Sequence, residues 1–150
     1  MNAVIKKGAP FTDSEFPPEM SSLANKDDPA DKHSKMHGIE WRRASDLYPK
    51  LQVFIDGIEP NDISQGSLGN CYFLAVLSAM AENPERIEAR FHTKEANGAG
   101  IYLMTFFVNG KEFPVWVDDF LPCRHNRPTF SSSREGELWG ILLEKGWAKL

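Results

Sequence analysis

The chain has 150 residues, of which 41% are hydrophobic, and this suits a single domain with its own core. The 17 basic residues against 21 acidic ones give a net charge of −4, which offers no basic surface for nucleic acid. The first residues contain no signal-peptide pattern, and no run reaches the ~18 apolar residues of a membrane-spanning helix. We therefore expect a soluble, cytoplasmic protein without a nucleic-acid partner or a membrane span.

Cysteine and histidine usage argues against a disulfide scaffold and against a metal site built from these residues. The two cysteines, Cys71 and Cys123, are best interpreted as free thiols in an intracellular chain. There is no Cys-x-x-Cys pair, and no histidine stands at metal-ligand spacing from either cysteine. His33 and His37 lie in a polar stretch, so we expect both side chains to be solvated.

The sequence divides into an N-terminal lead-in and a denser body. Residues 1–38 show no sustained periodicity and include a polar run at 25–35, so we expect an extended segment on the surface. Residues 39–150 carry the apolar patterns and form the body. Within the body, the small residues of 62–70 predict a loop.

After that loop the pattern predicts a helix that starts at Cys71. Its apolar residues follow helical spacing, with alanines between them, so we expect a central, buried helix. It should stop before Asn83-Pro84, because a residue that precedes proline avoids the helical region. Asn83 then suits the N-cap, and Pro84 the first position, of a short helix through Glu88.

A hairpin and a last helix follow. Residues 101–108 are β-branched and aromatic, Asn109-Gly110 is a strong hairpin-turn signal, and 111–117 return as the partner strand. Asp118 and Asp119 close the hairpin, where a role in the turn is expected. Residues 137–150 are amphipathic without a stop signal, so we expect the natural chain to continue. The whole pattern predicts an α+β fold.

The residue with the clearest chemical potential is Cys71, which stands where a glycine-containing loop enters the apolar helix. The free N–H groups and the dipole at a helix start favour a thiolate and can hold an oxyanion. Gln65 stands six residues upstream and offers a side-chain N–H donor. Position alone, however, favours a simpler interpretation, in which Cys71 is a small hydrophobic residue of the core.

The full string Gln65-Gly66-Ser67-Leu68-Gly69-Asn70-Cys71-Tyr72-Phe73-Leu74-Ala75 resembles the active-site segment of the calpain family of cysteine proteases. Further resemblances occur in order along the chain. They are Phe11-x-Asp13-x-x-Phe16-Pro17, Trp41-x-Arg43, Phe54-x-x-Gly57, Val117-Asp118-Asp119-x-Leu121-Pro122 and Glu137-x-Trp139-x-x-Leu142-Leu143-Glu144-Lys145-x-x-Ala148-Lys149. The chain departs from the family at Asn70, where Asp is usual, and at Tyr72, where Trp is usual.

The resemblance implies that Cys71 is the nucleophile and Gln65 the oxyanion-hole glutamine. It also implies the fold, a papain-like cysteine protease half, and a calcium-dependent intracellular endopeptidase acting on protein substrates. Calcium is the implied cofactor, and the matching ligands are the carbonyls of Ile55 and Gly57 with the carboxylates of Asp62 and Glu137. Without the resemblance, Asp62 is a turn residue and Glu137 stabilises a helix start.

A thiol protease also needs a histidine and an Asn or Asp, which papain-like chains carry about 130–150 residues after the cysteine. That spacing lies beyond Leu150, so we expect residues 39–150 to be the Cys-bearing subdomain and the fragment to be inactive alone. Its implied partner is the second subdomain of the protease core. The alternative is a non-catalytic homologue that serves as a regulatory or protein-binding module. A third possibility is an unrelated α+β binding domain with a buried cysteine.

Overall fold

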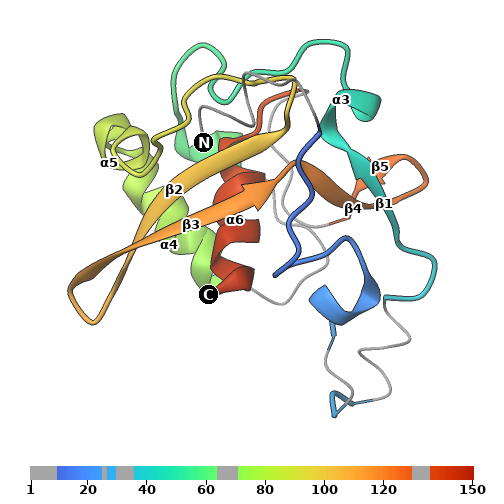
Figure 1. The fold of residues 1–150 in the computed structure, drawn as a ribbon. Helices are drawn as coiled ribbons and strands as arrows, with labels where there is room; N and C mark the ends of the chain where they lie inside the picture. The colour runs from blue at the N-terminus through green and yellow to red at the C-terminus, as the bar shows by residue number, and fades with distance from the viewer. Residues whose placement is uncertain (1–9, 25–26, 30–35, 64–70, 130–135) are drawn as a thin grey trace.

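The computed structural model describes residues 10–24, 27–29, 36–63, 71–129 and 136–150. Within these ranges the fold mixes short helices with two small antiparallel sheets (Figure 1). In chain order the elements are η1 (Met20–Ser22), β1 (Glu40–Arg43), α3 (Ala44–Leu47), η2 (Pro60–Asp62), α4 (Cys71–Ala81), α5 (Pro84–Glu88), β2 (Ile101–Val108), β3 (Lys111–Asp118), β4 (Phe120–Arg124), β5 (Arg127–Pro128) and α6 (Trp139–Lys149). The predicted α+β mixture is therefore confirmed.

The predicted hairpin is present, with the expected turn. β2 pairs with β3 in a register that runs from Ile101 opposite Asp118 to Val108 opposite Lys111. Asn109 and Gly110 both adopt positive φ, 51° and 75°, as the favoured two-residue hairpin turn requires. Figure 1 shows this hairpin crossing in front of α6, with α4 beside it.

Helix α4 starts at Cys71 and ends at Ala81, as its sequence predicts. One face is buried in the core through Phe73, Leu74 and Leu77, among others. The expected burial holds for this face of the helix only, since Tyr72 on the other side is 61% exposed. The helix therefore buries one apolar face in the core and leaves a second apolar face exposed.

Helix α5 begins at Pro84, with Asn83 in an extended conformation at the N-cap. The side chain of Asn83 makes no capping hydrogen bond, so the predicted N-cap position is confirmed without its usual interaction. The first residue of the helix is the proline, whose fixed φ suits this place.

A three-stranded sheet, in the order β1-β4-β5, was not predicted from the sequence. β1 pairs antiparallel with β4, so that Trp41 lies opposite Pro122. The strands are short, and β1 lies about 80 residues from its partner β4, so this pair leaves no local hairpin signal, whereas β5 pairs with β4 across the turn at His125 and Asn126. The three-stranded sheet lies on the far side of the hairpin from α5 (Figure 1).

The N-terminal lead-in is partly integrated into the fold, which corrects the expectation of a surface segment. Asp13 is only 2% exposed, and the Phe11 N–H donates to the carbonyl of Ala99 at 2.8 Å. The division at residue 38 stays a prediction. The core itself joins α4, the hairpin and α6 into one cluster with Trp139, Tyr102 and Leu142 fully buried.

Candidate active site

Cys71 is the first residue of α4, and its side chain is exposed. Core packing fixes the helix behind it, since the ring of Phe73 stacks on Trp147 of α6 with centroids 5.2 Å apart. The thiol thus lies at the start of an anchored helix and is exposed to solvent. Gln65, the predicted oxyanion donor, lies outside the described residues.

Tyr72, the aromatic residue after the cysteine, is exposed to solvent and is hydrogen-bonded to α6. The Tyr72 hydroxyl accepts a hydrogen bond from Trp147 Nε1–H at 3.2 Å. This bond and the Phe73–Trp147 stack join the first turn of α4 to the last turn of α6. The position of Cys71 therefore depends on α6.

Two of the predicted calcium ligands are neighbours in the structure. Glu137 precedes α6, is 1% exposed, and its Oε1 accepts the backbone N–H of Ile55 at 2.8 Å. A parallel bridge between Gln52 and Glu137 holds the two segments together. The turn that follows Ile55 uses positive φ at both Asp56 (54°) and Gly57 (103°). The turn therefore has a left-handed backbone at two successive residues, and it follows directly on the residue that donates to the buried Glu137 carboxylate.

Asp62, the other predicted carboxylate, ends η2 and is 3% exposed. Its Oδ2 accepts the N–H of Glu59 at 2.6 Å, which forms half of a capping box. The described residues hold no group of three or more His, Cys, Asp or Glu side chains suited to a metal. The predicted set is of another kind, with two carboxylates and two backbone carbonyls. Its all-oxygen chemistry fits calcium, and whether the four converge on one ion stays a prediction.

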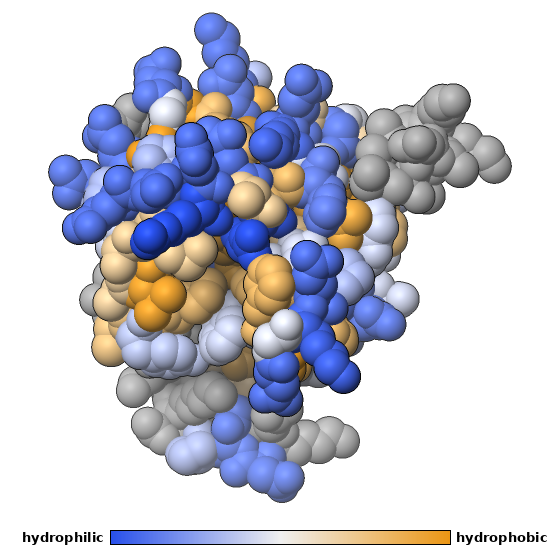
Figure 2. All heavy atoms as spheres, turned by 90° about the vertical axis from the view of Figure 1, so that its left-hand side faces the viewer, coloured by the Kyte–Doolittle hydropathy of each residue, from blue (hydrophilic) through white to orange (hydrophobic). Residues whose placement is uncertain are grey.

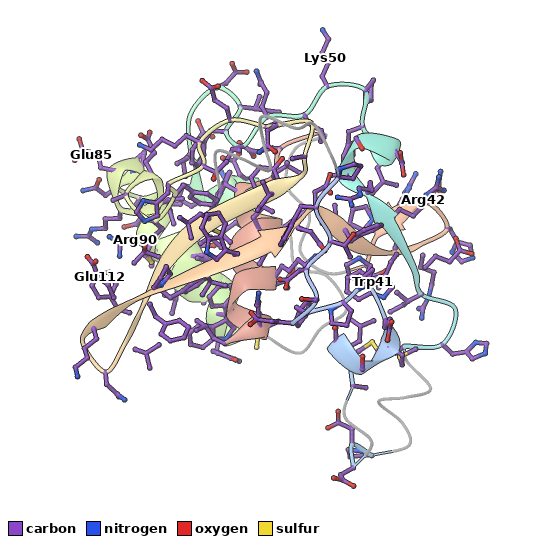
Figure 3. The ribbon with its side chains drawn as sticks, viewed as in Figure 1. Trp41, Arg42, Lys50, Glu85, Arg90 and Glu112 are labelled. Carbon is purple, nitrogen blue, oxygen red and sulfur yellow. The ribbon has the colours of Figure 1, made fainter. Side chains whose placement is uncertain are left out.

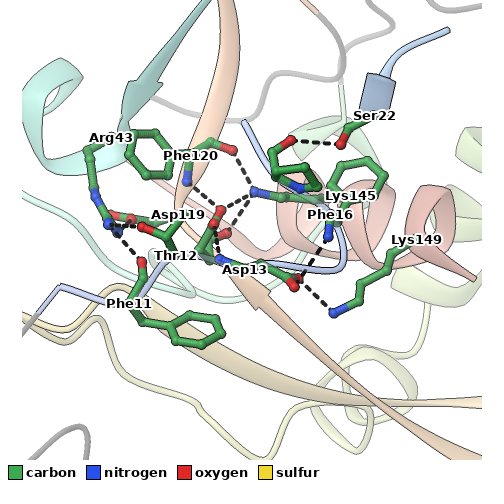
Figure 4. Close-up of polar contacts among 12 residues, drawn as sticks. Phe11, Thr12, Asp13, Phe16, Ser22, Arg43, Asp119, Phe120, Lys145 and Lys149 are labelled. Atoms are coloured by element: carbon green, nitrogen blue, oxygen red, sulfur yellow. Dashed lines mark hydrogen bonds and ion pairs between the residues drawn. The ribbon is translucent and has the colours of Figure 1, made fainter. Parts of the chain in front are cut away.

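A buried ion-pair network, which was missed in the sequence, connects the lead-in to the body (Figure 4). Asp13 Oδ2 pairs with Lys149 Nζ at 2.7 Å, while the Asp13 N–H donates to Asp118 Oδ2 at 2.7 Å. Lys145 Nζ pairs with Asp118 Oδ1 and also donates to the carbonyl of Phe120 at 2.8 Å. Asp118 Oδ1 accepts the N–H of Phe120 at 3.0 Å, which agrees with the expected turn role, and the fully buried carboxylate takes part in the ion pair as well. Lys145 and Lys149, one helical turn apart, were the available signal.

A second pair flanks this network. Arg43 Nη1 binds Asp119 Oδ1 at 2.6 Å, and Nη2 donates to the carbonyl of Phe11 at 2.7 Å. Burial raises the pKa of the Asp119 carboxyl, and the bond from Arg43 opposes that rise. Burial likewise lowers the pKa of Lys145, against the attraction of Asp118. The Arg43–Asp119 and Lys145–Asp118 pairs are both largely buried. Removal of either partner would leave an uncompensated buried charge, which is strongly destabilising.

Cys123 differs sharply from Cys71. It is 1% exposed on β4, and its Sγ–H donates to the carbonyl of Leu121 at 3.4 Å. Burial raises the pKa of the Cys123 thiol to about 11, which suppresses the reactive thiolate. This environment agrees with a structural role for Cys123.

The histidines of the described ranges lie in three separate places of the fold. His92 Nε2 and Thr105 Oγ1 share a hydrogen bond at 2.7 Å beside β2. His125 occupies the turn between β4 and β5 with φ of 51°. His37 offers its carbonyl to Arg124 Nη2 at 2.9 Å.

Residues 11–150 match the model of the family described as calpain family cysteine protease. The chain belongs to the calpain family. The α+β fold is accordingly that of a papain-like calpain protease subdomain, as the sequence predicts.

Curated calpains match nearly the whole chain. Calpain-5 of Caenorhabditis elegans is 37% identical over 155 residues, which cover 97% of this chain and 23% of that protein. The calpain-type cysteine protease DEK1 of Zea mays is 38% identical, over 99% of this chain and 7% of that protein. The Calpain-1 catalytic subunit of Bos taurus is 35% identical, over 97% and 21%. The chain thus spans less than a quarter of each of these relatives. None of the described helices is both long and apolar enough to span a membrane.

Proposed function

We propose that the chain is the nucleophile-bearing half of a calcium-dependent, cytoplasmic cysteine endopeptidase that cleaves exposed, flexible segments of proteins. The observation that carries the proposal is an exposed Cys71 at the first residue of α4, inside a calpain-family match over residues 11–150. The names of the relatives, which describe calpains and calpain-type cysteine proteases, support the same activity.

In the proposed reaction the Cys71 thiolate attacks the carbonyl carbon of a peptide bond. A C–S bond forms, the C–N bond breaks, and the amine leaves with a proton from a histidine outside residues 1–150. Water then hydrolyses the thioester, releases the acid and restores the thiol. The side-chain N–H of Gln65 is proposed to bind the oxyanion during both steps. Without the histidine, residues 1–150 are expected to be inactive alone.

Calcium is the proposed cofactor, bound by the carbonyls of Ile55 and Gly57 and the carboxylates of Asp62 and Glu137. When bound, it supplies positive charge that links two segments distant in sequence. The Ile55 N–H donates to Glu137 Oε1 at 2.8 Å, so the two segments that carry these ligands already lie side by side. Because Glu137 leads directly into α6, which contacts the first turn of α4, occupancy would stabilise the position of Cys71.

The activity is tested in a chimera, because residues 1–150 are expected to lack the base. The matched stretch of Calpain-5 from Caenorhabditis elegans is replaced by this chain, and casein hydrolysis is measured with calcium. We expect hydrolysis that Cys71→Ser abolishes and Cys123→Ser preserves. A folded chimera without hydrolysis, whose parent relative is active, would contradict the enzyme and favour the non-catalytic module.

Calcium binding is tested on the 150-residue chain by titration calorimetry. We expect saturable binding near one ion per chain, which the double variant Asp62→Asn, Glu137→Gln loses. The matched control is Asp46→Asn, which removes an exposed carboxylate on α3. Absence of binding by the folded wild-type chain would contradict the proposed site and leave the nucleophile untouched.

A further inference from the structure

Thr12 is an exposed threonine in the N-terminal lead-in, and the residues on both sides of it are fixed to the body. The Phe11 N–H donates to the carbonyl of Ala99 at 2.8 Å, and the Asp13 N–H donates to Asp118 Oδ2 at 2.7 Å. The other threonines in the described part of the chain are buried or half-buried. The side chain of Thr12 is therefore accessible while its backbone holds one position.

One guanidinium reaches the hydroxyl of this threonine (Figure 4). Arg43 Nη2 donates to Thr12 Oγ1 at 3.4 Å, which is long for a hydrogen bond, and to the carbonyl of Phe11 at 2.7 Å. Arg43 Nη1 binds Asp119 Oδ1 at 2.6 Å. A guanidinium has more N–H donors than these contacts use. A cation therefore lies beside the oxygen atom that would carry a phosphoryl group.

The guanidinium of Arg43 is held in place by its surroundings. Its Cζ lies over the ring of Phe120, 4.2 Å from the ring centroid. The side chain of Arg43 is 16% exposed, so it is largely withdrawn from water. A fixed, planar fork of N–H donors suits the binding of two phosphate oxygens at once, and it needs little reorganisation to do so.

The alternation of side chains along β1 explains why Arg43 faces the lead-in. Trp41 and Arg42 leave the strand on opposite sides (Figure 3), as successive strand residues do. Arg43 stands two residues after Trp41 and shares its side. Arg42 instead donates to Asn126 Oδ1, at the turn between β4 and β5. Arg42 is therefore a neighbouring arginine that bonds elsewhere, which makes it a matched control.

The sequence around Thr12 has the charge pattern of an acidophilic kinase substrate. In the order Thr12-Asp13-Ser14-Glu15, carboxylates stand one and three residues after the threonine. Kinases select their substrates by such charge patterns. The side chain of Glu15 is 80% exposed, whereas Asp13 is 2% exposed and would be presented when the lead-in opens from the body.

We propose that Thr12 is a phosphorylation site and that Arg43 binds its phosphate. In the reaction Thr12 Oγ1 attacks the γ-phosphorus of ATP, an O–P bond forms, the bond from that phosphorus to the bridging oxygen breaks, and ADP leaves. The hydroxyl proton passes to a carboxylate of the kinase. The product carries about −1.5 to −2 charges at neutral pH and forms charge-assisted hydrogen bonds with the guanidinium. This modification goes beyond the proposed function, because no step of it involves proteolysis.

Two effects of the phosphate oppose each other, and the geometry decides between them. The carboxylates of Asp13 and Asp119 repel it, but both are already paired, with Lys149 at 2.7 Å and with Arg43 at 2.6 Å. The guanidinium lies within contact distance of the oxygen of Thr12. Attraction at contact distance outweighs repulsion from neutralised pairs. Phosphorylation therefore fastens the lead-in to β1.

The test compares the 150-residue chain with and without phosphothreonine at position 12, which is introduced during synthesis by codon suppression. Hydrogen–deuterium exchange is followed in residues 10–16, which contain the N–H groups of Phe11 and Asp13 that bind the body. We expect exchange there to be at least about threefold slower in the phosphorylated chain. Residues 84–88 of α5, on the side of the molecule that faces the viewer in Figure 2, are the internal reference and should not change. Equal or faster exchange of residues 10–16 would overturn the proposal.

Matched controls separate a specific contact from added charge. Phosphoserine at position 14, an exposed residue of the same segment, adds the same charge and should give no protection. Arg43→Lys keeps the positive charge without the planar fork and should lose most of the protection, while Arg42→Lys should keep it. Each variant is compared with its own unphosphorylated form, so a general change in stability cancels. Protection that survives Arg43→Lys, or that position 14 reproduces, would rule out the Arg43 site.

A phosphorus NMR titration gives a second measurement that needs no variant of Arg43. The guanidinium should lower the second pKa of the phosphate at position 12 below that of the phosphate at position 14, because it stabilises the dianion. Equal pKa values for the two phosphates would contradict the contact with Arg43.

The kinase is tested by incubating the 150-residue chain with ATP and an acidophilic serine/threonine kinase. We expect phosphate on Thr12, located by mass spectrometry, and a rate at least about tenfold lower for Glu15→Gln. The matched control is Glu19→Gln, which removes an exposed carboxylate outside the pattern and should react like the wild type. A chain that stays unmodified at Thr12 would overturn its assignment as the site. No arm of these tests reads proteolysis, so this proposal and the proposed function can fail separately.

Discussion

The buried pair of Lys145 and Asp118 gives the most quantitative prediction. Lys145 is 7% exposed and donates to three oxygens, namely Asp118 Oδ1, the Asp118 carbonyl and the Phe120 carbonyl. Replacement by methionine keeps the length of the side chain but removes the charge and all three donors. A fully buried Asp118 carboxylate then loses its cation, which typically costs about 3–5 kcal/mol.

The assay is urea unfolding of Lys145→Met at neutral pH. With an m-value of about 2 kcal/mol/M, the expected loss moves the midpoint down by about 1.5–2.5 M. The matched control is Lys94→Met, since Lys94 and Glu88 form an exposed pair at 3.7 Å. Such a surface pair contributes at most about 1 kcal/mol, so the control should unfold near the wild type. Equal midpoints for the two variants would refute the reasoning that the network is a structural necessity.

Three further predictions concern thiols, helix packing and pH. In the folded chain one thiol should react rapidly with an alkylating reagent and map to Cys71, because Cys123 is 1% exposed; two equally fast thiols would contradict this. Gly146→Ala should destabilise by about 1–3 kcal/mol, since a Cβ there would lie 2.8 Å from Phe106 Cε2. Gly140→Ala, whose Cβ has its nearest contact at 3.9 Å, should be neutral or stabilising in the same unfolding assay, and similar losses for both would be inconsistent with this packing. Burial raises the pKa of Cys123 from 9.0 to about 11, so its contribution to stability is complete below pH 9.0 and lost as the pH rises through about 11. Cys123→Ala should therefore flatten the fall of unfolding free energy over that window, and an unchanged slope would count against it.

Local patterns in the sequence predict the hairpin and the two middle helices well. Helix α4 starts at Cys71 and the turn at Asn109-Gly110 because loop composition and turn chemistry act over a few residues. The three-stranded sheet is different, since Trp41 meets Pro122 only when segments about 80 residues apart come together. Such pairing leaves no periodic trace in either segment.

The candidate site was predictable where it depends on neighbouring residues and not where it depends on residues far apart in the sequence. The cysteine and its helix form one local unit, so the position of Cys71 follows from the sequence. The ion-pair network does not, because Asp13 and Lys149 are 136 residues apart and polar residues of this kind normally face solvent. The exposed side of α4 was not predicted, because apolar composition alone does not tell which side of a helix faces the core.

The most direct test of the central claim is to locate a covalent adduct on the chimera after treatment with a peptidyl vinyl sulfone. A thiolate nucleophile adds to the vinyl carbon and leaves a stable thioether, which peptide mapping assigns to one residue. The account predicts a single calcium-dependent adduct on Sγ of Cys71, absent in Cys71→Ser and unchanged in Cys123→Ser. An unmodified Cys71 in a folded, calcium-loaded chimera would contradict its assignment as the nucleophile.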